Sequence, residues 1–114
     1  IWFARNYRTH VANTLLLDNA LATMGAGLPS AMMAAILYPK RRVLAVCGDG
    51  GFMMTAQEIA TAMHEGAHPI LLVFNNNMYG TIRMHQEKHY PKRISATNLT
   101  NPDFAAFAAA FGVG

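Results

Sequence analysis

The sequence has a single cysteine, few charged side chains and no long apolar run. One cysteine, Cys47, excludes a disulfide framework within the chain and gives no sign of secretion, so we expect a cytoplasmic protein. Charged residues make up only 13% of the 114 residues and hydrophobic residues 53%, a combination that excludes intrinsic disorder. The longest apolar runs, Ala31–Tyr38 and Phe104–Phe111, are far shorter than the ~18 residues of a membrane span.

The chain also lacks the charge and the motifs of a protein that binds nucleic acids or nucleotides. Nine basic residues against six acidic ones give a net charge of only +3. The basic residues gather in two short groups, Lys40–Arg42 and Lys88–Arg93, that are typical of solvated loops. No Gly-x-Gly-x-x-Gly turn follows a strand pattern, and no Walker-type lysine is present. We expect no nucleic-acid partner and disfavour a nucleotide-binding α/β domain.

The two ends of the sequence lead us to expect a piece of a longer protein. The chain begins at Ile1 without an initiator methionine, and it stops at Gly114 directly after a helical pattern. Apolar residues are abundant for this size, and eight residues are methionines, which pack adaptably at irregular contacts. We expect residues 1–114 to be one partial domain of a multidomain protein, with apolar surfaces that meet its missing parts.

Two continuous apolar runs of strand length, Val43–Cys47 and Ile70–Phe74, predict strands buried on both faces, as in a parallel sheet. Between them, Thr55 and Glu58 have the spacing of a capping box that opens a helix, and Gly66 is a natural helix end. Two strands joined by a helix form a βαβ unit. The predicted fold is therefore α/β, a doubly wound parallel sheet with flanking helices.

The predicted flanking helices lie before and after this unit. Small apolar residues predict a buried helix over Ser30–Tyr38, and a short helix is expected within Tyr79–His89, followed by an irregular stretch, Pro91–Thr100. Asn101 is expected to cap a last helix that is rich in alanine. Three aromatic residues of that helix recur on one face and predict a core contact: Phe104, Phe107 and Phe111.

Glycines and polar residues follow both predicted strands at the points where the strands end. Gly48–Gly51 follow the first strand, and Asn75–Asn77 follow the second. Ligands of open α/β sheets bind beyond the carboxyl ends of the strands, so we expect Asp49 and the asparagines to converge. A carboxylate, an amide oxygen and loop carbonyls are hard ligands suited to Mg²⁺ or Ca²⁺, and glycines let backbone amides approach an anion. These residues predict a phosphate–Mg²⁺ site.

Each motif alone is common turn chemistry, but the two together, with 24 residues between them, are far more specific. Gly48–Gly50, followed at this spacing by Asn75 and Asn76, resembles the signature of the thiamine-diphosphate-dependent enzymes. Further segments resemble the acetolactate synthase group: Ala22–Ala31, Thr55–Ala62 and Asn77–Arg83. The resemblance covers roughly residues 18–112 and implies an incomplete thiamine-diphosphate-binding fold.

The resemblance implies thiamine diphosphate and Mg²⁺ as cofactors and assigns their ligands. Mg²⁺ would be held by the carboxylate of Asp49, the side chain of Asn76 and the backbone carbonyl of Met78. The Gly50–Gly51 backbone would face the diphosphate, and Met24 would lie under the bent cofactor, although a methionine taken alone is more typical of core packing. The implied cofactor-binding residues are Met24, Gly48, Asp49, Gly50, Gly51, Asn76, Met78 and Tyr79.

The same resemblance implies an enzyme that acts on a small 2-oxo acid, as a carboligase (a transferase) or a decarboxylase (a lyase). In this family a glutamate on a separate pyrimidine-binding domain activates the cofactor. No candidate for it is found here, so no catalytic residue is identified in this piece. The family's site lies between subunits, which implies a homodimer or homotetramer. Ile82 stands where the pyruvate-decarboxylase-like branch has an acidic residue, and this disfavours simple release of an aldehyde.

Several interpretations stay open at this point. A non-catalytic homologue could keep the fold as an interaction or regulatory module, although the intact Asp49 and Asn76 speak against a retired site. His85 and His89, four residues apart, could hold a transition metal, border a substrate entrance or be ordinary surface residues. Cys47 is interpreted as a small hydrophobic residue. The sequence does not specify the 2-oxo acid, the second substrate or a flavin requirement.

Overall fold

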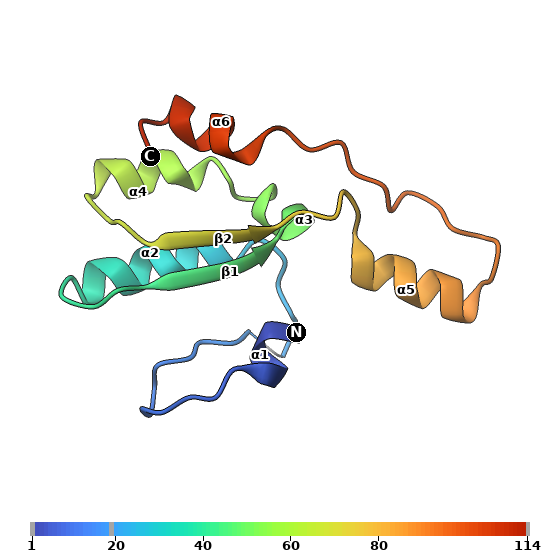
Figure 1. Ribbon diagram of the computed structural model, residues 1–114, viewed down its shortest axis with the longest axis horizontal. Helices are drawn as coiled ribbons and strands as arrows, with labels where there is room; N and C mark the ends of the chain where they lie inside the picture. Colours follow the sequence, from blue (N-terminus) through green and yellow to red (C-terminus); the bar gives the residue numbers. More distant parts are fainter. Residues whose placement is uncertain (1, 19, 114) are drawn as a thin grey trace.

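The computed structural model describes residues 2–18 and 20–113, and a small parallel sheet lies at its centre (Figure 1). In chain order the elements are α1 (Trp2–Asn6), α2 (Gly27–Leu37), β1 (Leu44–Gly48), α3 (Asp49–Phe52), α4 (Glu58–His64), β2 (Ile70–Phe74), α5 (Gly80–His89) and α6 (Phe104–Ala110). Helices α2, α3, α4 and α6 gather around the sheet, whereas α1 and α5 project away from it (Figure 1). The predicted α/β fold, a parallel sheet with flanking helices, is confirmed.

Strands β1 and β2 pair in parallel, with Leu44 opposite Ile70 at one end and Gly48 opposite Phe74 at the other. β2 spans the predicted residues, and β1 begins and ends one residue later than the predicted Val43–Cys47. Because the strands are parallel and in register, the residues that follow Gly48 and Phe74 emerge at the same edge of the sheet. This is the edge at which the sequence predicts the site.

The core lies against one face of the sheet. Its buried cluster consists of Leu28 of α2, Phe52 of α3, Ala56 of the turn before α4, and Ile59 of α4. The rings of Phe52 and Phe104 meet edge to face with their centroids 5.5 Å apart, so α6 packs on α3. The other apolar side chains against this cluster are Cys47, Leu71, Val73, Phe107, Phe111 and Val113. The predicted core roles of the phenylalanine stripe and of the cysteine are therefore confirmed.

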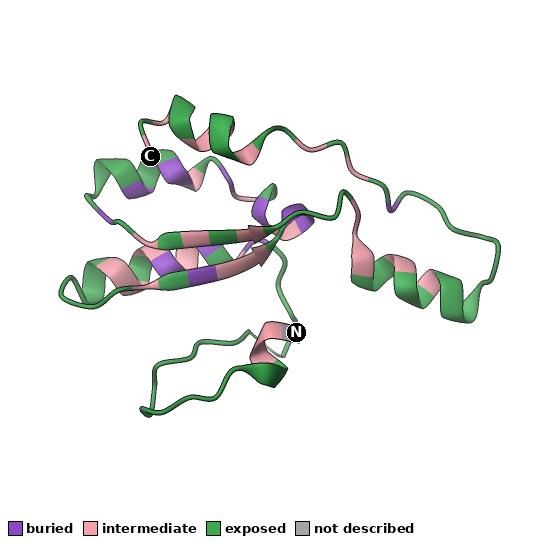
Figure 2. Ribbon diagram, in the orientation of Figure 1, coloured by how far each residue is buried: buried purple, intermediate pink, exposed green. Residues whose placement is uncertain are grey.

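Exposed and partly buried residues alternate along β2 (Figure 2), so the face of the sheet opposite the core is exposed within this chain. Its side chains, Leu44 of β1 and Ile70, Leu72 and Phe74 of β2, are 43–59% exposed. The expectation that both faces are buried is wrong for these residues. Side chains alternate along a strand, and the helices that form the core cluster pack only against the face that carries Cys47 and its neighbours.

Helix α5 is attached to the rest of the chain through the loop that follows it and not through the core. No residue of this helix is buried. The side chain of Gln86 makes two 3.0 Å hydrogen bonds with the backbone of Ser95, and Arg83 bonds both Asn98, at 3.1 Å, and Glu87, at 3.0 Å. The predicted short helix and irregular stretch are confirmed. In the part of the chain that the structure describes, no helix combines the length and apolar character needed to cross a membrane.

Candidate functional site

Asp49 lies at the junction of β1 and α3. The strand ends at Gly48, whose backbone is extended, and α3 begins at the next residue without an intervening loop. The other end of this short helix is fixed in the core by Phe52, so the carboxylate at its start is drawn inside and is only 2% exposed. Among the residues that the structure describes, no basic side chain forms an ion pair with Asp49. A buried carboxylate is costly unless it is paired or binds a metal.

The side-chain amide of Asn101 is the hydrogen-bond partner of this carboxylate. Its Nδ2 donates to Oδ2 of Asp49 at 2.6 Å, to Oδ1 of Asn75 at 2.9 Å and to Oδ1 of Asn77 at 3.3 Å. The convergence that the sequence predicts therefore occurs for Asp49 and two of the three asparagines. Three side-chain oxygens from the ends of both strands therefore lie around the single Nδ2 atom of Asn101.

The sequence assigned Asn101 to the cap of the last helix, and that assignment is wrong. The cap of α6 is Asp103, whose Oδ1 accepts hydrogen bonds from the backbone N–H of Ala105 and Ala106 at 2.9 and 3.1 Å. Asparagine and aspartate are equally good caps, so the sequence around Pro102 offers two candidates, and local pattern alone does not choose between them. The contact of Asn101 with Asp49 spans 52 residues of sequence, which no local pattern reveals.

Asn76, the predicted metal ligand, accepts from the backbone two residues on, as Asn75 does, but within the described residues it is not a partner of Asn101. Its Oδ1 accepts a hydrogen bond from the backbone N–H of Met78 at 3.2 Å, which closes a turn within the loop. An amide oxygen has two lone pairs, so this bond leaves one of them available to a cation. The side chain that sequence analysis selected is thus held in place by the backbone of Met78, the second predicted ligand of the same loop.

The backbone of Met78 is oriented by a bridge to the segment before α6. Met78 lies opposite Asn98 in an isolated antiparallel bridge. The bonds of the bridge are Tyr79 N to Thr97 O and Leu99 N to Asn77 O, both 2.8 Å. These bonds flank Met78, so its own N–H and C=O point away from the partner segment. Since that N–H bonds Asn76 Oδ1, the carbonyl of Met78 faces the same side of the loop as the Asn76 oxygen.

Gly50 and Tyr79, both predicted to bind the cofactor, are in contact with each other. A Cβ atom placed on Gly50 would lie 2.5 Å from Cε1 of the Tyr79 ring, so only glycine allows this ring to rest on α3. Gly51 is different, because a Cβ there would find its nearest neighbour, the backbone nitrogen of Gly25, at 3.7 Å. Gly50 therefore has a packing role in α3, whereas a Cβ at Gly51 would make only an ordinary contact.

Thr55 ties the segment that contains Met24 to the same region. Its Oγ1 donates a 2.7 Å hydrogen bond to the carbonyl of Gly25. The predicted capping box is wrong, because α4 begins at Glu58, is preceded by Gln57 and has no side-chain cap. Residues 53–57 form turns that direct Thr55 toward the glycine segment instead. Met24 is 41% exposed and so is not a core residue in this chain, which leaves its side chain accessible beside α3.

The donor set at this edge fits a hard divalent cation. This edge of the sheet offers a buried carboxylate, an amide oxygen and an outward-facing carbonyl, on Asp49, Asn76 and Met78, and none of these three residues carries a thiol or an imidazole. Such oxygen ligands suit Mg²⁺, Ca²⁺ or Mn²⁺ and not zinc or copper. A cation would also balance the negative charge of the buried Asp49 carboxylate.

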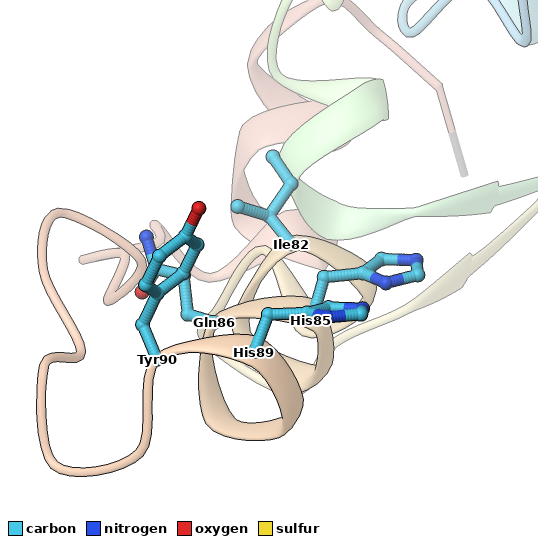
Figure 3. Close-up of a pocket in the computed structure, with 5 residues that line it drawn as sticks. All are labelled: Ile82, His85, Gln86, His89 and Tyr90. Carbon is cyan, nitrogen blue, oxygen red and sulfur yellow. The ribbon is translucent and has the colours of Figure 1, made fainter.

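The two histidines of α5 lie outside this cluster. Together with Ile82, Gln86 and Tyr90, His85 and His89 line a hollow along the helix (Figure 3). The imidazole rings are nearly parallel, at 16°, with their centroids 6.1 Å apart, so the predicted common face is confirmed. Within the described residues, no three His, Cys, Asp or Glu side chains form a group that could hold a metal ion. The structure does not bring these histidines to Asp49.

Comparison with known proteins agrees with the fold and the position of the motifs. The family model described as thiamine pyrophosphate enzyme, C-terminal TPP binding domain, matches residues 1–114, the whole chain. The chain belongs to the thiamine pyrophosphate enzyme family. Thiamine pyrophosphate is the cofactor also called thiamine diphosphate. The predicted family is thus confirmed, and a nucleotide-binding α/β domain is not needed to explain the glycine turn.

Curated relatives of this thiamine pyrophosphate domain include several acetolactate synthases. The chain is 36% identical over 112 residues to acetolactate synthase of Bacillus subtilis, with 98% of this chain and 20% of the relative covered. It is 33% identical over 114 residues to a probable acetolactate synthase large subunit of Methanocaldococcus jannaschii, covering 99% of this chain and 19% of that protein. The chain therefore spans about a fifth of the length of these relatives. It is a thiamine-pyrophosphate-binding domain of the acetolactate-synthase-like branch.

Proposed function

We propose that this domain binds the diphosphate end of thiamine diphosphate through Mg²⁺, in an enzyme that processes a 2-oxo acid. The observation that carries the proposal is Asp49, a 2%-exposed acidic residue at the end of a parallel strand, which has a neutral amide as its partner and no ion pair with a basic side chain among the described residues. The other oxygens of the proposed site belong to the loop after the neighbouring strand, at the edge where open α/β sheets bind their ligands.

The proposed Mg²⁺ ligands are the carboxylate of Asp49, Oδ1 of Asn76 and the backbone carbonyl of Met78. The orientation of the Met78 carbonyl toward the Asn76 side of the loop supports this set. Three protein ligands leave half of an octahedron for diphosphate oxygens and water, which is how Mg²⁺ is commonly bound. With no lysine or arginine in the loop, the metal would neutralise most of the diphosphate charge.

The remaining predicted contacts surround the same edge. Gly48 and Gly51 would give the diphosphate access to the backbone, and the open space beside Gly48 supports its role. Gly50 would act indirectly, by seating the ring of Tyr79 beside the metal loop. The exposed side chain of Met24 would support the organic part of the cofactor. When bound, thiamine diphosphate supplies a carbon nucleophile for addition to a carbonyl group, which no side chain of this domain provides.

The proposed substrate class and subunit assembly are those that the resemblance to the acetolactate-synthase-like branch implies. Several relatives are named acetolactate synthases, so we propose a carboligase or decarboxylase that acts on a 2-oxo acid. Ile82, an apolar residue after the metal loop, disfavours an enzyme that simply releases an aldehyde. We propose that a pyrimidine-binding domain, of the same or a second subunit, completes the site in a homodimer or homotetramer. A cytoplasmic location remains a prediction.

Calorimetric titration of thiamine diphosphate into the full-length protein in the presence of Mg²⁺ tests the proposal. Asp49→Ala should abolish measurable binding, because it removes the only charged protein ligand from a site that holds a polyanion. Glu65→Ala, which removes an exposed carboxylate at the end of α4, is the matched control and should bind as the parent does. Unchanged affinity in the Asp49 variant would show that the cofactor is held elsewhere. A parent that fails to bind the cofactor at all would favour a non-catalytic homologue.

A further inference from the structure

The side-chain amide of Asn101 has more oxygen neighbours than it has protons to donate. Nδ2 carries two protons, yet three oxygens lie at 2.6, 2.9 and 3.3 Å, on Asp49, Asn75 and Asn77. The shortest of these bonds is to the carboxylate, as expected for an ionised acceptor. The amide therefore links the end of β1 to the end of β2 through side chains.

Packing fixes the position of Asn101 relative to Asp49. Phe104, three residues after Asn101, meets the ring of Phe52 edge to face at 5.5 Å, and Phe107 meets the same ring at 6.5 Å. Phe52 belongs to α3, the one-turn helix that Asp49 begins. Both ends of the short Asn101–Asp49 bond are thus attached to the same aromatic cluster, and the bond is a built contact and not a chance meeting of two loops.

We propose that Asn101 is a positioning residue of the metal site. By holding Oδ2 of Asp49, it leaves Oδ1 to face the cation, and by drawing in Asn75 and Asn77 it keeps the metal loop against the end of β1. The predicted ligands Asn76 and Met78 are not partners of this amide within the described residues. Asn101 thus holds the residues on either side of Asn76 and leaves the ligand itself free. This inference rests on the proposed Mg²⁺ site.

A competing account makes the opposite prediction. If Nδ2 stood at the point that the cation takes, the amide would have to leave before the metal could bind, and removing it would strengthen metal binding. The positioning account predicts weaker binding, because the carboxylate and the loop would lose their alignment. Loss of a residue that orients a metal ligand typically lowers metal affinity 10–100-fold. The sign of the change decides between the two.

The test uses Mn²⁺ as the probe, since it accepts the same oxygen ligands and its free form is measured by electron paramagnetic resonance. Mn²⁺ is titrated into the full-length protein with inorganic diphosphate present, so no turnover is required. Asn101→Ala should raise the Mn²⁺ dissociation constant at least tenfold. Asn101→Ser, which keeps a donor too short to span the three oxygens, should raise it in the same direction, and it carries the test should the alanine variant not fold.

Asp103→Ala is the matched control, because it removes the cap of α6 without touching Asp49. It should lower the melting temperature while leaving the Mn²⁺ dissociation constant within twofold of the parent's. Unchanged or tighter Mn²⁺ binding in folded Asn101 variants would overturn the positioning role, provided that Asp49→Ala still abolishes binding. Retention of Mn²⁺ binding in Asp49→Ala would instead overturn the proposed metal site, so the two failures are distinguishable.

Discussion

Replacing Gly50 by alanine should destabilise the protein, because the new methyl group would meet the ring of Tyr79. The added Cβ would lie 2.5 Å from Cε1 and 2.6 Å from Cδ1 of that ring, and 3.1 Å from Cδ1 of Leu99. Gly50 is buried within α3, so the methyl group cannot turn toward solvent. Forcing extra volume into a packed site typically costs about 1–3 kcal/mol.

Gly51→Ala is the control that isolates this clash. The two glycines are adjacent in α3, and exchanging either for alanine gains about 0.5–1 kcal/mol by restricting the unfolded chain. At Gly51 the nearest atom to the new Cβ is 3.7 Å away, an ordinary contact. The gain from restricting the unfolded chain is the same in both variants and cancels when they are compared. Their free energies of unfolding should differ by about 1–3 kcal/mol, the cost of the overpacking.

Urea denaturation of the full-length protein without cofactor measures that difference. The Gly50→Ala variant should regain most of the lost stability when it is combined with Tyr79→Ala, since the ring that it meets is then gone. Gly51→Ala should be at least as stable as the parent yet bind thiamine diphosphate more weakly, because its methyl group would enter the space proposed for the diphosphate. Equal stability of the two glycine variants would refute the contact between α3 and Tyr79.

Three further predictions concern other contacts of the chain. Thr55→Val should lower the free energy of unfolding by about 1 kcal/mol, because it removes the hydrogen bond to the Gly25 carbonyl, whereas Thr55→Ser retains this bond. Chemical denaturation measures both variants, and equal losses of stability would contradict the role of the hydroxyl. Burial raises the pKa of the Cys47 thiol, so the unfolded chain loses this proton first as pH rises. The free energy of unfolding should therefore fall as pH rises above the ordinary thiol pKa. A Cys47→Ala variant whose free energy of unfolding falls equally steeply at alkaline pH would contradict this. Residues 1–114 alone, given Mg²⁺ and thiamine diphosphate, should consume no pyruvate, because the activating glutamate is expected on another domain. General acid–base catalysis typically raises a reaction rate 10²–10⁴-fold. Turnover at the rate of the full-length protein would contradict this expectation.

Local pattern predicted the elements of the fold that depend on local chemistry. The apolar run at Ile70–Phe74 is a strand with the predicted bounds, and the aromatic stripe of α6 packs into the core. The order of strand, glycine turn, helix and strand placed Asp49 and the asparagines at one edge of a parallel sheet, which the register confirms. These features follow from periodicity and from the geometry of parallel strands.

Contacts between distant segments were beyond the reach of the same reasoning. Thr55 had the spacing of a cap, but its hydroxyl bonds Gly25, 30 residues away, because the turn after α3 directs it toward that segment. Asn101 had the local context of a cap, but Asp103 takes that role and releases Asn101 to reach Asp49. In both cases a tertiary partner competed with a local one for the same polar group, and sequence pattern records only the local option.

A crystal structure of the full-length protein with Mg²⁺ and thiamine diphosphate tests the central claim most directly. We expect one Mg²⁺ at about 2.0–2.1 Å from a carboxylate oxygen of Asp49, from Oδ1 of Asn76 and from the carbonyl oxygen of Met78, with diphosphate oxygens completing the octahedron. A metal ion bound by Asn75 or Asn77 in place of Asn76, or a diphosphate held away from the end of β1, would contradict the account.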